Sequence, residues 1–416
     1  MVACFNEDGI ELGTPSTFIK YFSDGYDNEA VALEETSDGG FIMLMNSTIQ
    51  DSEAQTPRNK ACLIKTDQYG TELWRHYFPP INLDTPRWIA HSLTLVENGG
   101  YLVMGESINA QTGSSNMLAF KAFVDENNPT NVTLTSKVFK PTGPSDPFNY
   151  STIGEAATIK VVDPTDPTNG NYLFVASSEN PTGKMVVGEL NSSDLSIDWS
   201  ISRGEDAISI LTNRLFFNLN GDNLIYWGGT VTKTLGEKSD IRFTENPINT
   251  IPSGDNNIGN AAYAEAANDM CLSGNIFCFV GSIDKTGNNK DIYFLRGTSG
   301  ADTVVYRSQF VSGTFINDKN EEANSVSTTK DGGFIILATI DTYTGIIGRG
   351  NTDLLLMKVN AFGDYQWSVN YGSLDADFGK AVRQTTDGGY IALGTARLAG
   401  TRTLMVIKTD KTGDVD

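Results

Sequence analysis

The sequence predicts an all-β fold: a seven-bladed β-propeller of four-stranded antiparallel blades, closed by an N-terminal strand that completes the last blade. Three observations lead to this prediction. A segment built around an Asp-Gly or Asn-Gly turn recurs along the chain. Glycine is abundant, at 41 of 416 residues. The last copy of the segment lacks a strand that the N-terminus can supply. Copies of this length are typical of propeller blades and too long for leucine-rich or ankyrin units.

The three clearest copies share Asp-Gly-Gly, then Phe or Tyr and an apolar run, beginning at Asp38, Asp331 and Asp387. Four further copies are degenerate but keep a glycine turn before an apolar run. Seven turn signals therefore mark the chain, at residues 38, 98, 169, 220, 273, 331 and 387. Asn, Asp and Gly reach positive φ at low cost, so each signal predicts a tight hairpin.

Each copy contains four predicted strands. The first alternates small and apolar residues, and the second is a continuous apolar run, as expected for a strand buried on both faces. The third carries Leu-x-Lys-x-Asp, and the fourth carries Trp74, Trp199 or Trp367 after a short turn. These tryptophans and Trp227 are predicted core residues. Units that cannot bury both faces alone must stack, and radial stacking gives a propeller.

Closure of the ring is predicted by the two ends of the chain. The last copy stops at Asp416, before its fourth strand, and residues 17–23 form an orphan strand that matches residues 73–78. Pairing the two ends would hide two exposed strand edges. The fourth copy is the weakest, and we expect its last strand near residues 248–251, with an irregular outer edge because prolines lie nearby.

The composition describes an acidic, core-forming chain. Apolar residues make up 39%, charged residues 19%, and the net charge is −21. A phosphate-backbone binder needs clustered Lys and Arg, so nucleic acid is excluded as a partner. An anionic membrane surface would repel the chain, and no apolar run approaches the ~18 residues of a membrane span. We therefore expect membrane contact only through a lipid anchor.

The pattern of Asp-Gly-Gly-Phe/Tyr, then Leu-x-Lys-x-Asp-x-x-Gly, then Trp resembles propeller repeats of exported and cell-surface proteins of Bacteroidota. The resemblance covers nearly the whole chain after residue 16. It implies the architecture and says little about activity, because function is carried by loops that vary between proteins of one fold.

The start of the chain, Met1-Val2-Ala3-Cys4 followed by acidic residues, is similar to the end of a bacterial lipobox. The similarity implies a lipidated Cys4 and a surface-exposed protein anchored to the outer membrane. The chain departs from the pattern because neither a charged n-region nor an apolar h-region precedes Cys4. The alternative is an ordinary cysteine in a tail. We expect residues 1–16 to be a tether and residues 17–416 to form a single propeller domain.

Cys271 and Cys278 flank the turn at Ser273-Gly274-Asn275. If the turn is centred after Gly274, the two cysteines lie opposite each other, close enough for a cross-strand disulfide. An exported location would favour that bond. The alternative is that both are small buried hydrophobic residues. The other internal cysteine, Cys62, is expected in the core.

Acidic residues recur where the first strand of a copy begins. In propellers that strand lines the central channel, so these residues could form a carboxylate ring at one channel mouth. Such a ring could hold Ca²⁺ or a basic group of a partner, although the chain contains no Asp-x-Asp-x-Asp-Gly calcium loop. The alternative is that each carboxylate caps local backbone or bonds to the neighbouring blade. The residues are Glu29, Glu155, Asp206, Glu322 and Asp377.

Aromatic residues in the predicted loops are the better candidates for binding a ligand or partner. Exposed aromatic rings suit sugar stacking and protein hot spots. The alternative is that several pack beneath their own loops. The candidates are Tyr26, Trp88, Phe148, Tyr150, Phe315, Tyr343 and Phe378.

The sequence contains no recognisable catalytic constellation. Only two histidines are present, and His91 has no evident partner in the sequence for nucleophilic or metal chemistry. We therefore predict a non-catalytic surface lipoprotein that binds an outer-membrane or cell-surface partner, as an accessory subunit of an uptake or assembly complex, without a cofactor. The alternative is a propeller that binds or cleaves glycans with carboxylates at the channel mouth; a purely structural module is a third hypothesis.

Overall fold

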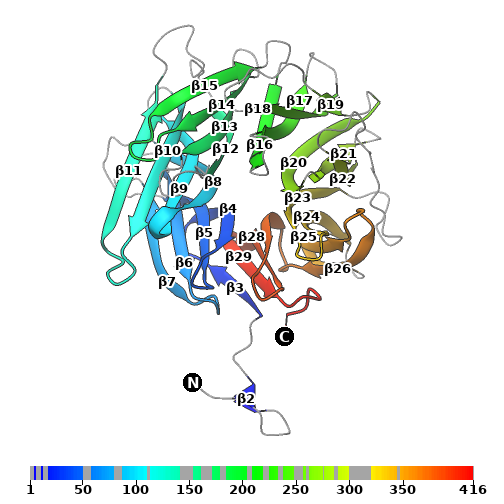
Figure 1. Cartoon of the computed structure of the whole chain (residues 1–416). Helices are drawn as coiled ribbons and strands as arrows, with labels where there is room; N and C mark the ends of the chain where they lie inside the picture. Colours follow the sequence, from blue (N-terminus) through cyan, green and yellow to red (C-terminus); the bar gives the residue numbers. More distant parts are fainter. Residues whose placement is uncertain are drawn as a thin grey trace.

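The computed structural model describes most of the chain as β-strand (Figure 1). The residues it describes are 4–5, 11–12, 17–49, 58–78, 87–109, 113–140, 153–160, 171–178, 184–203, 209–218, 224–232, 238–247, 256–258, 262–274, 276–284, 289–298, 320–343 and 347–415. Within this part of the chain, the one helical element is a 3-10 turn, η1 (Glu97–Gly99). No helix in the described residues is long and apolar enough to span a membrane.

The strands form one antiparallel sheet for each predicted repeat, and we number the repeats 1 to 7 in chain order. Repeat 1 contains β4 (Asp27–Glu35), β5 (Phe41–Ile49), β6 (Arg58–Thr66) and β7 (Glu72–Phe78). Repeat 2 contains β8 (Arg87–Val96), β9 (Gly100–Ile108), β10 (Ser115–Val124) and β11 (Val132–Phe139). Repeat 3 contains β12 (Ile153–Lys160), β13 (Tyr172–Ser178), β14 (Lys184–Leu190) and β15 (Ile197–Arg203).

The remaining repeats follow the same order from the inner to the outer strand. Repeat 4 contains β16 (Ser209–Asn218), β17 (Leu224–Thr232), β18 (Asp240–Pro247) and β19 (Asn256–Ile258). Repeat 5 contains β20 (Ala264–Ser273), β21 (Ile276–Asp284) and β22 (Lys290–Thr298). Repeat 6 contains β23 (Glu321–Thr328), β24 (Phe334–Tyr343), β25 (Ile347–Val359) and β26 (Tyr365–Tyr371). Repeat 7 contains β27 (Asp377–Gln384), β28 (Tyr390–Leu398), β29 (Thr401–Thr409) and β3 (Phe18–Phe22).

This topology confirms an all-β propeller fold with four-stranded antiparallel blades. It shows six complete four-stranded blades, one fewer than the sequence predicts, because repeat 5 has three strands among the described residues. Its expected fourth strand would fall in residues 299–319, which lie outside the described residues. In repeat 4 the last strand is β19, at residues 256–258 rather than the predicted 248–251, and it has only three residues.

The N-terminal strand β3 pairs with β29, so the two ends of the chain share one sheet. Phe18 lies opposite Lys408, the register position that Trp74 and Trp367 hold opposite Lys65 and Lys358. Phe18 therefore replaces the tryptophan of the fourth strand. Its ring lies against the turn glycine Gly70 of repeat 1, where a Cβ atom would come within 2.6 Å of it.

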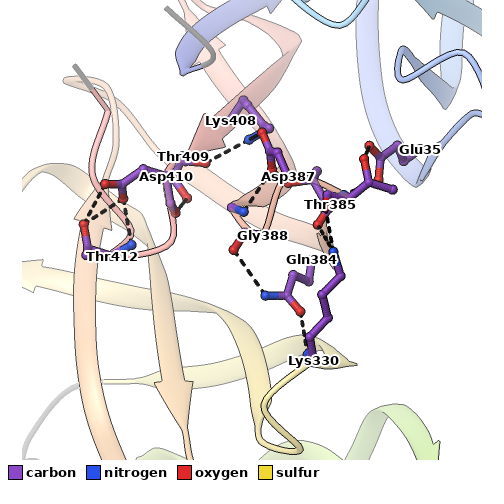
Figure 2. Close-up of polar contacts among 12 residues, drawn as sticks. Glu35, Lys330, Gln384, Thr385, Asp387, Gly388, Lys408, Thr409, Asp410 and Thr412 are labelled. Atoms are coloured by element: carbon purple, nitrogen blue, oxygen red, sulfur yellow. Dashed lines mark hydrogen bonds and ion pairs between the residues drawn. The ribbon is translucent and has the colours of Figure 1, made fainter.

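The Asp-Gly-Gly turns explain why the clearest repeats carry that motif (Figure 2). In repeat 7, Asp387 accepts hydrogen bonds from the hydroxyl of Thr385 and the N–H of Gly389, and its second oxygen pairs with Lys408 at 2.8 Å. Gly388 has a φ of 88°, the left-handed region that favours glycine. A Cβ at Gly389 would overlap the Thr409 carbonyl. The first glycine is needed for the turn and the second for close approach.

The core lies between neighbouring sheets. Clusters of buried apolar side chains join repeats 1 and 2, 2 and 3, 4 and 5, 5 and 6, 6 and 7, and 7 and 1. The second strand of each clear repeat, such as Phe334–Ala338, is fully buried, as the continuous apolar run predicts. These clusters lie between the faces of neighbouring sheets, and the innermost strands gather around a common centre (Figure 1).

Of residues 1–16, the structure describes only β1 (Cys4–Phe5) paired with β2 (Glu11–Leu12). The side chain of Cys4 lies outside the described residues.

Candidate functional site at the starts of the innermost strands

Five innermost strands share a local irregularity that sets their alignment. Each has a β-bulge directly after a small residue, where one extra residue enters the strand. The small residues are Ala30, Ala90, Ala267, Ala323 and Gly379. These positions can therefore be compared between repeats as one level of the ring.

The same level carries a repeated hydrogen bond between neighbouring sheets. The N–H of the small residue donates to a side-chain oxygen on the second strand of the preceding repeat. Ala90 donates to Asn46 at 2.8 Å, and Gly379 donates to Thr339 at 3.0 Å. Ala30 donates to Thr395 at 2.9 Å, which joins repeat 7 to repeat 1. The innermost strands begin at one end of the propeller, on the N-terminal side of this level. We call that end the mouth.

Strand alternation divides the mouth into two rows of side chains. The residue directly before the bulge level faces solvent: the side chain of Glu29 is 58% exposed, that of Glu322 is 32% exposed, and Phe378 is 48% exposed. The residue two before that level is buried in each of the five repeats. We call these the exposed row and the buried row. The buried row consists of Asn28, Trp88, Glu265, Glu321 and Asp377.

In the exposed row, an aromatic ring stands between two carboxylates. Repeats 6, 7 and 1 are neighbours, so Glu322, Phe378 and Glu29 follow one another around the mouth. Arg402 of repeat 7 pairs with Glu29 at 3.3 Å. Lys290 of repeat 5 pairs with Glu322 at 3.1 Å, and the Asn268 amide donates to the same carboxylate. Both carboxylates are therefore held in place by cations, and Phe378 is left uncovered between them.

In the buried row, two of the polar side chains bond to the loop that precedes their strand. Asn28 donates to Asp24 at 2.8 Å, and Asp377 accepts from the backbone and hydroxyl of Ser373. Burial raises the pKa of Asp377, although the Ser373 hydrogen bonds oppose that effect. These contacts fix the loops at the mouth and are structural.

Glu321 differs from these equivalents. It is 8% exposed, yet its carboxyl forms no hydrogen bond with any residue in the described part of the chain. Burial, followed by the nearby carboxylates of Asp291 and Asp341, raises its pKa to about 7. The Asp341 carboxylate is held by the backbone N–H and side-chain amide of Asn320, each at 3.2 Å. Glu321 is thus a buried acid whose ionisation two further acids disfavour.

Three further apolar side chains are exposed at the same end of the molecule as Phe378. Leu374 precedes β27 and is 84% exposed. Leu398 lies at the end of β28, and Tyr26 directly precedes β4; both are also exposed. Arg402 lies in β29, beside the turn that follows Leu398, and its backbone N–H donates to Asp27, next to Tyr26. The four apolar residues therefore lie in loops and strand ends of repeats 7 and 1, at the mouth.

The structure places the predicted carboxylates in different settings. Glu29 and Glu322 lie in the exposed row, whereas Asp377 turns into the buried row, so the three do not form one ring. Glu155 lies in β12 with its side chain outside the described residues, and Asp206 lies outside them altogether. Among the residues that the structure describes, no group of three or more His, Cys, Asp or Glu side chains is arranged to hold a metal ion.

Among the predicted loop aromatics, Tyr26 and Phe378 are exposed at the mouth, but Phe378 lies in strand β27 and not in a loop. Trp88 is not a loop residue: it lies in β8, is 7% exposed and stacks on Phe120 with ring centroids 5.4 Å apart. The strand begins at Arg87, one residue before Trp88. Tyr343 lies in β24 with its side chain outside the described residues. Phe148, Tyr150 and Phe315 lie outside the described residues.

Cys271 and Cys278 lie directly opposite each other in β20 and β21, as predicted from the turn. They form no disulfide: both are free, buried thiols, as is Cys62. Burial, together with the hydrogen bond to Cys271, raises the pKa of the Cys278 thiol well above its usual value. His91 has a partner that the sequence did not reveal, because Nε2 lies 3.6 Å from Glu106 Oε1 on the adjacent strand.

The sequence predicts Glu322 as a site residue but not its neighbour Glu321. The strand register is the signal that distinguishes the two residues. Two residues before the small residue of a repeat, the side chain is buried, and Ala323 is the small residue of repeat 6. A carboxyl at that position must be neutral, bonded or functional.

No protein-family model matches the chain, and no curated protein matches it. Among solved structures, it resembles the α-L-arabinanase of Penicillium chrysogenum, solved with arabinobiose, with a TM-score of 0.50 and 11% identity over 81% of this chain and 96% of that one. It also resembles the β-propeller domain of the Trilobed protease from Pyrococcus furiosus, with a TM-score of 0.48 and 10% identity over 94% and 99% of the two chains. For a NanB sialidase variant from Streptococcus pneumoniae, the TM-score is 0.47 and the identity 12%, over 96% of this chain and 71% of that one. At this level of identity, the likeness concerns the fold alone.

Proposed function

We propose that this chain is a carbohydrate-recognising β-propeller that binds a glycan at the mouth. The observation that carries the proposal is Phe378, a half-exposed ring between the carboxylates of Glu322 and Glu29. Sugar sites combine an aromatic plate with a few polar groups in fixed positions. The ion pairs with Lys290 and Arg402 supply that fixation, since they hold each carboxylate before any ligand arrives.

Binding can be tested with affinity electrophoresis of the full chain in gels containing arabinan, xylan or dextran, and with calorimetric titration of sialyllactose. Arabinan is the first probe because the arabinanase neighbour was solved with arabinobiose. We expect retardation of the wild type by at least one glycan and loss of it in Phe378→Ala. Phe362→Ala is the matched control, since Phe362 is 64% exposed in the turn at the opposite end of repeat 6. The proposal fails if no glycan binds or if both variants behave alike.

The proposed site relies on a ring of seven repeats. We propose that repeat 5 is the seventh blade and that repeats 7 and 1 close the ring. Four contacts between these two repeats support closure: Thr395 with Ala30, Arg383 with Glu34, Thr386 with Glu35, and Arg402 with Asp27. They connect residues more than 300 positions apart in sequence at both ends of the innermost strands.

A second candidate function is the surface scaffold predicted from the sequence, in which the chain is a lipid-anchored accessory subunit of an outer-membrane complex. The observation that favours it is the exposure of four apolar side chains at one end of the molecule, since exposed apolar surface suits a protein interface. They are Tyr26, Leu374, Phe378 and Leu398. Co-purification from detergent-solubilised outer membranes tests it. A stoichiometric membrane partner lost in Leu374→Asp would support the scaffold, and recovery of the chain alone would count against it.

A further inference from the structure

Repeat 5 departs from repeats 1, 6 and 7 at the turn that joins its first two strands. In those three repeats, a buried lysine of the third strand pairs with the aspartate of the turn. Counted from the bulge level, Arg296 of repeat 5 occupies the position of the lysine, and Gly274 occupies that of the aspartate. Among the residues that the structure describes, Arg296 therefore pairs with no carboxylate, and its buried Nε–H donates no hydrogen bond.

Arg296 lies beside a pair of thiols instead. Cys278 is directly opposite Arg296 on one side and directly opposite Cys271 on the other, so the three side chains share one face of β20, β21 and β22. Isoleucine holds the position of Cys278 in repeats 1, 6 and 7. A cation beside a thiol favours the thiolate, which is the reactive form of cysteine. The charge of Arg296 accordingly opposes the effect of burial on the pKa of Cys278.

The backbone brings the two thiols within reach of each other. Directly opposed residues of an antiparallel pair have Cα atoms about 4.5–5.5 Å apart, inside the range of about 4.4–6.8 Å found for disulfides. The thiols of Cys271 and Cys278 are also hydrogen-bonded to each other. A bond between the two sulfur atoms therefore requires rotation of the side chains and no displacement of the strands.

Cys271 is the thiol that a small oxidant can reach first. It lies in the innermost strand, at the register position that Glu34 holds in repeat 1 and Arg383 holds in repeat 7. The side chains of Glu34 and Arg383 are 26% and 19% exposed, so this level of the centre is open to solvent. Cys271 retains 5% exposure, whereas Cys278 is fully buried behind it.

We propose that Cys271 and Cys278 are a redox modification site, a reversible dithiol that Arg296 activates toward hydroperoxides. The Cys271 thiolate attacks the peroxide and becomes a sulfenic acid, and the departing hydroxide takes up the proton that the thiol has lost. The Cys278 thiol then attacks that sulfur and releases water. Two thiols are thereby oxidised to one disulfide, and one hydrogen peroxide is reduced to two waters. A thiol reductant reverses the step by exchange. This inference is independent of the glycan site.

The test is oxidation of the reduced full chain by hydrogen peroxide, followed by alkylation of the remaining thiols and mass spectrometry of the peptides. We expect a disulfide between Cys271 and Cys278 that dithiothreitol returns to two thiols. Cys62 is the matched control within the same molecule, because it is buried and lies opposite Met45 and Tyr77 rather than a second thiol. It should stay reduced. Cys278→Ser should leave Cys271 as a sulfenic acid, which dimedone captures.

The role of Arg296 is tested by the rate of disulfide formation. Arg296→Met should slow it roughly 10-fold, the change in thiolate population for one unit of thiol pKa, whereas Arg296→Lys should retain most of the rate. Lys358→Met, the equivalent change in repeat 6, should leave the rate unaltered. Peroxide that leaves Cys271 and Cys278 free, or that oxidises Cys62 as fast as the pair, would overturn the proposal. An unchanged rate in Arg296→Met would also overturn it.

Discussion

At the scale of single residues, the buried lysines of the third strands explain how an acidic chain keeps its repeats in register. Lys65, Lys358 and Lys408 are almost fully buried, yet each ammonium pairs with the aspartate of its Asp-Gly-Gly turn. Each also donates to a backbone carbonyl of its own strand. The aspartates are about half exposed. Losing the partner therefore costs the buried lysine more free energy than it costs the aspartate.

That inequality predicts an asymmetric response to mutation. Asp387→Asn leaves the Lys408 charge buried with only the Thr409 carbonyl, whereas Lys408→Met leaves Asp387 partly hydrated and bonded to Thr385 and Gly389. We expect Asp387→Asn to lower the free energy of unfolding by on the order of 2 kcal/mol more than Lys408→Met. Urea denaturation measures the difference. Equal losses would show that desolvation of Lys408 is unimportant.

The same turns predict a loss of stability in acid. Partial burial acts to raise the pKa of Asp38 and of Asp331, but hydrogen bonds from lysine, threonine and glycine outweigh it and bring both to about 2. A group with a lowered folded-state pKa adds stability above its unfolded value, here 3.8, and loses it as the pH falls towards 2. Unfolding free energies measured from pH 6 to 2 should fall steeply below pH 4. Asp331→Asn should reduce that slope, and an unaltered slope would refute the assignment.

Glu321 predicts the opposite trend at higher pH. Its pKa is about 7 in the folded chain against 4.5 for the free side chain, so the folded state binds the extra proton and stability falls as the pH rises between these values. The full effect is on the order of 3 kcal/mol at 1.36 kcal/mol for each unit of pKa. Glu321→Gln should therefore stabilise the fold above pH 7 and flatten this part of the profile. Equal stability of the two proteins at pH 8 would exclude a buried, unbonded carboxyl.

At the scale of elements, hydrogen bonds between sheets allow two junctions to be compared. The terminal junction joins repeats 7 and 1, and the internal junction joins repeats 6 and 7. Thr395→Val removes the acceptor for Ala30 N–H and so weakens the junction of repeats 7 and 1; Thr339→Val removes the acceptor for Gly379 N–H between repeats 6 and 7. Each should cost about 1 kcal/mol or more, since a buried N–H is left unbonded. Similar losses in thermal unfolding would mean that the terminal junction is as firm as the internal one. No loss in Thr395→Val would mean that it is not formed in solution.

The elements with a local signal were predictable. The Asp-Gly-Gly hairpins of repeats 1, 6 and 7 lie where the motif places them, and β3 takes the place of a fourth strand, because Phe18 and Trp74 occupy the same register. Repeat 4 was harder to predict because its outer strand, β19, has three residues and little pattern. The strand position of Trp88 was also missed, since burial between two sheets depends on tertiary packing that the local sequence does not show.

The candidate site was predictable only in part, for a physical reason. The sequence located the acidic starts of the innermost strands, but it could not say which carboxylates face solvent. A bulge shifts the alternation of the two faces of a strand by one residue. Without the register, the sequence cannot tell whether Glu321 or Glu322 faces solvent. Similarly, Glu29 and Glu322 form ion pairs with Arg402 and Lys290, which lie on other repeats. No local sequence pattern predicts ion pairs between repeats.

At the scale of the whole molecule, the propeller has two unlike ends. One end carries the Asp-Gly-Gly turns, and the turn of repeat 6 is bonded to repeat 7 by contacts such as Lys330 with Gln384 (Figure 2). The other end carries the exposed apolar loops, Phe378 and the buried acid Glu321. A rigid end formed by short turns and an uncovered end formed by loops is the arrangement expected of a binding scaffold.

The central claim is that ligand binding takes place at the mouth, and hydrogen–deuterium exchange with and without the glycan that binds most tightly tests it most directly. The account predicts slower exchange in the mouth loops, residues 23–26, 372–376 and 398–401, with no change in the turns at 36–40, 329–333 and 385–389. Phe378→Ala should abolish the protection, with roughly 10- to 30-fold weaker binding, as for loss of a central aromatic anchor. Protection confined to the Asp-Gly-Gly turns, or protection that survives in Phe378→Ala, would contradict the account.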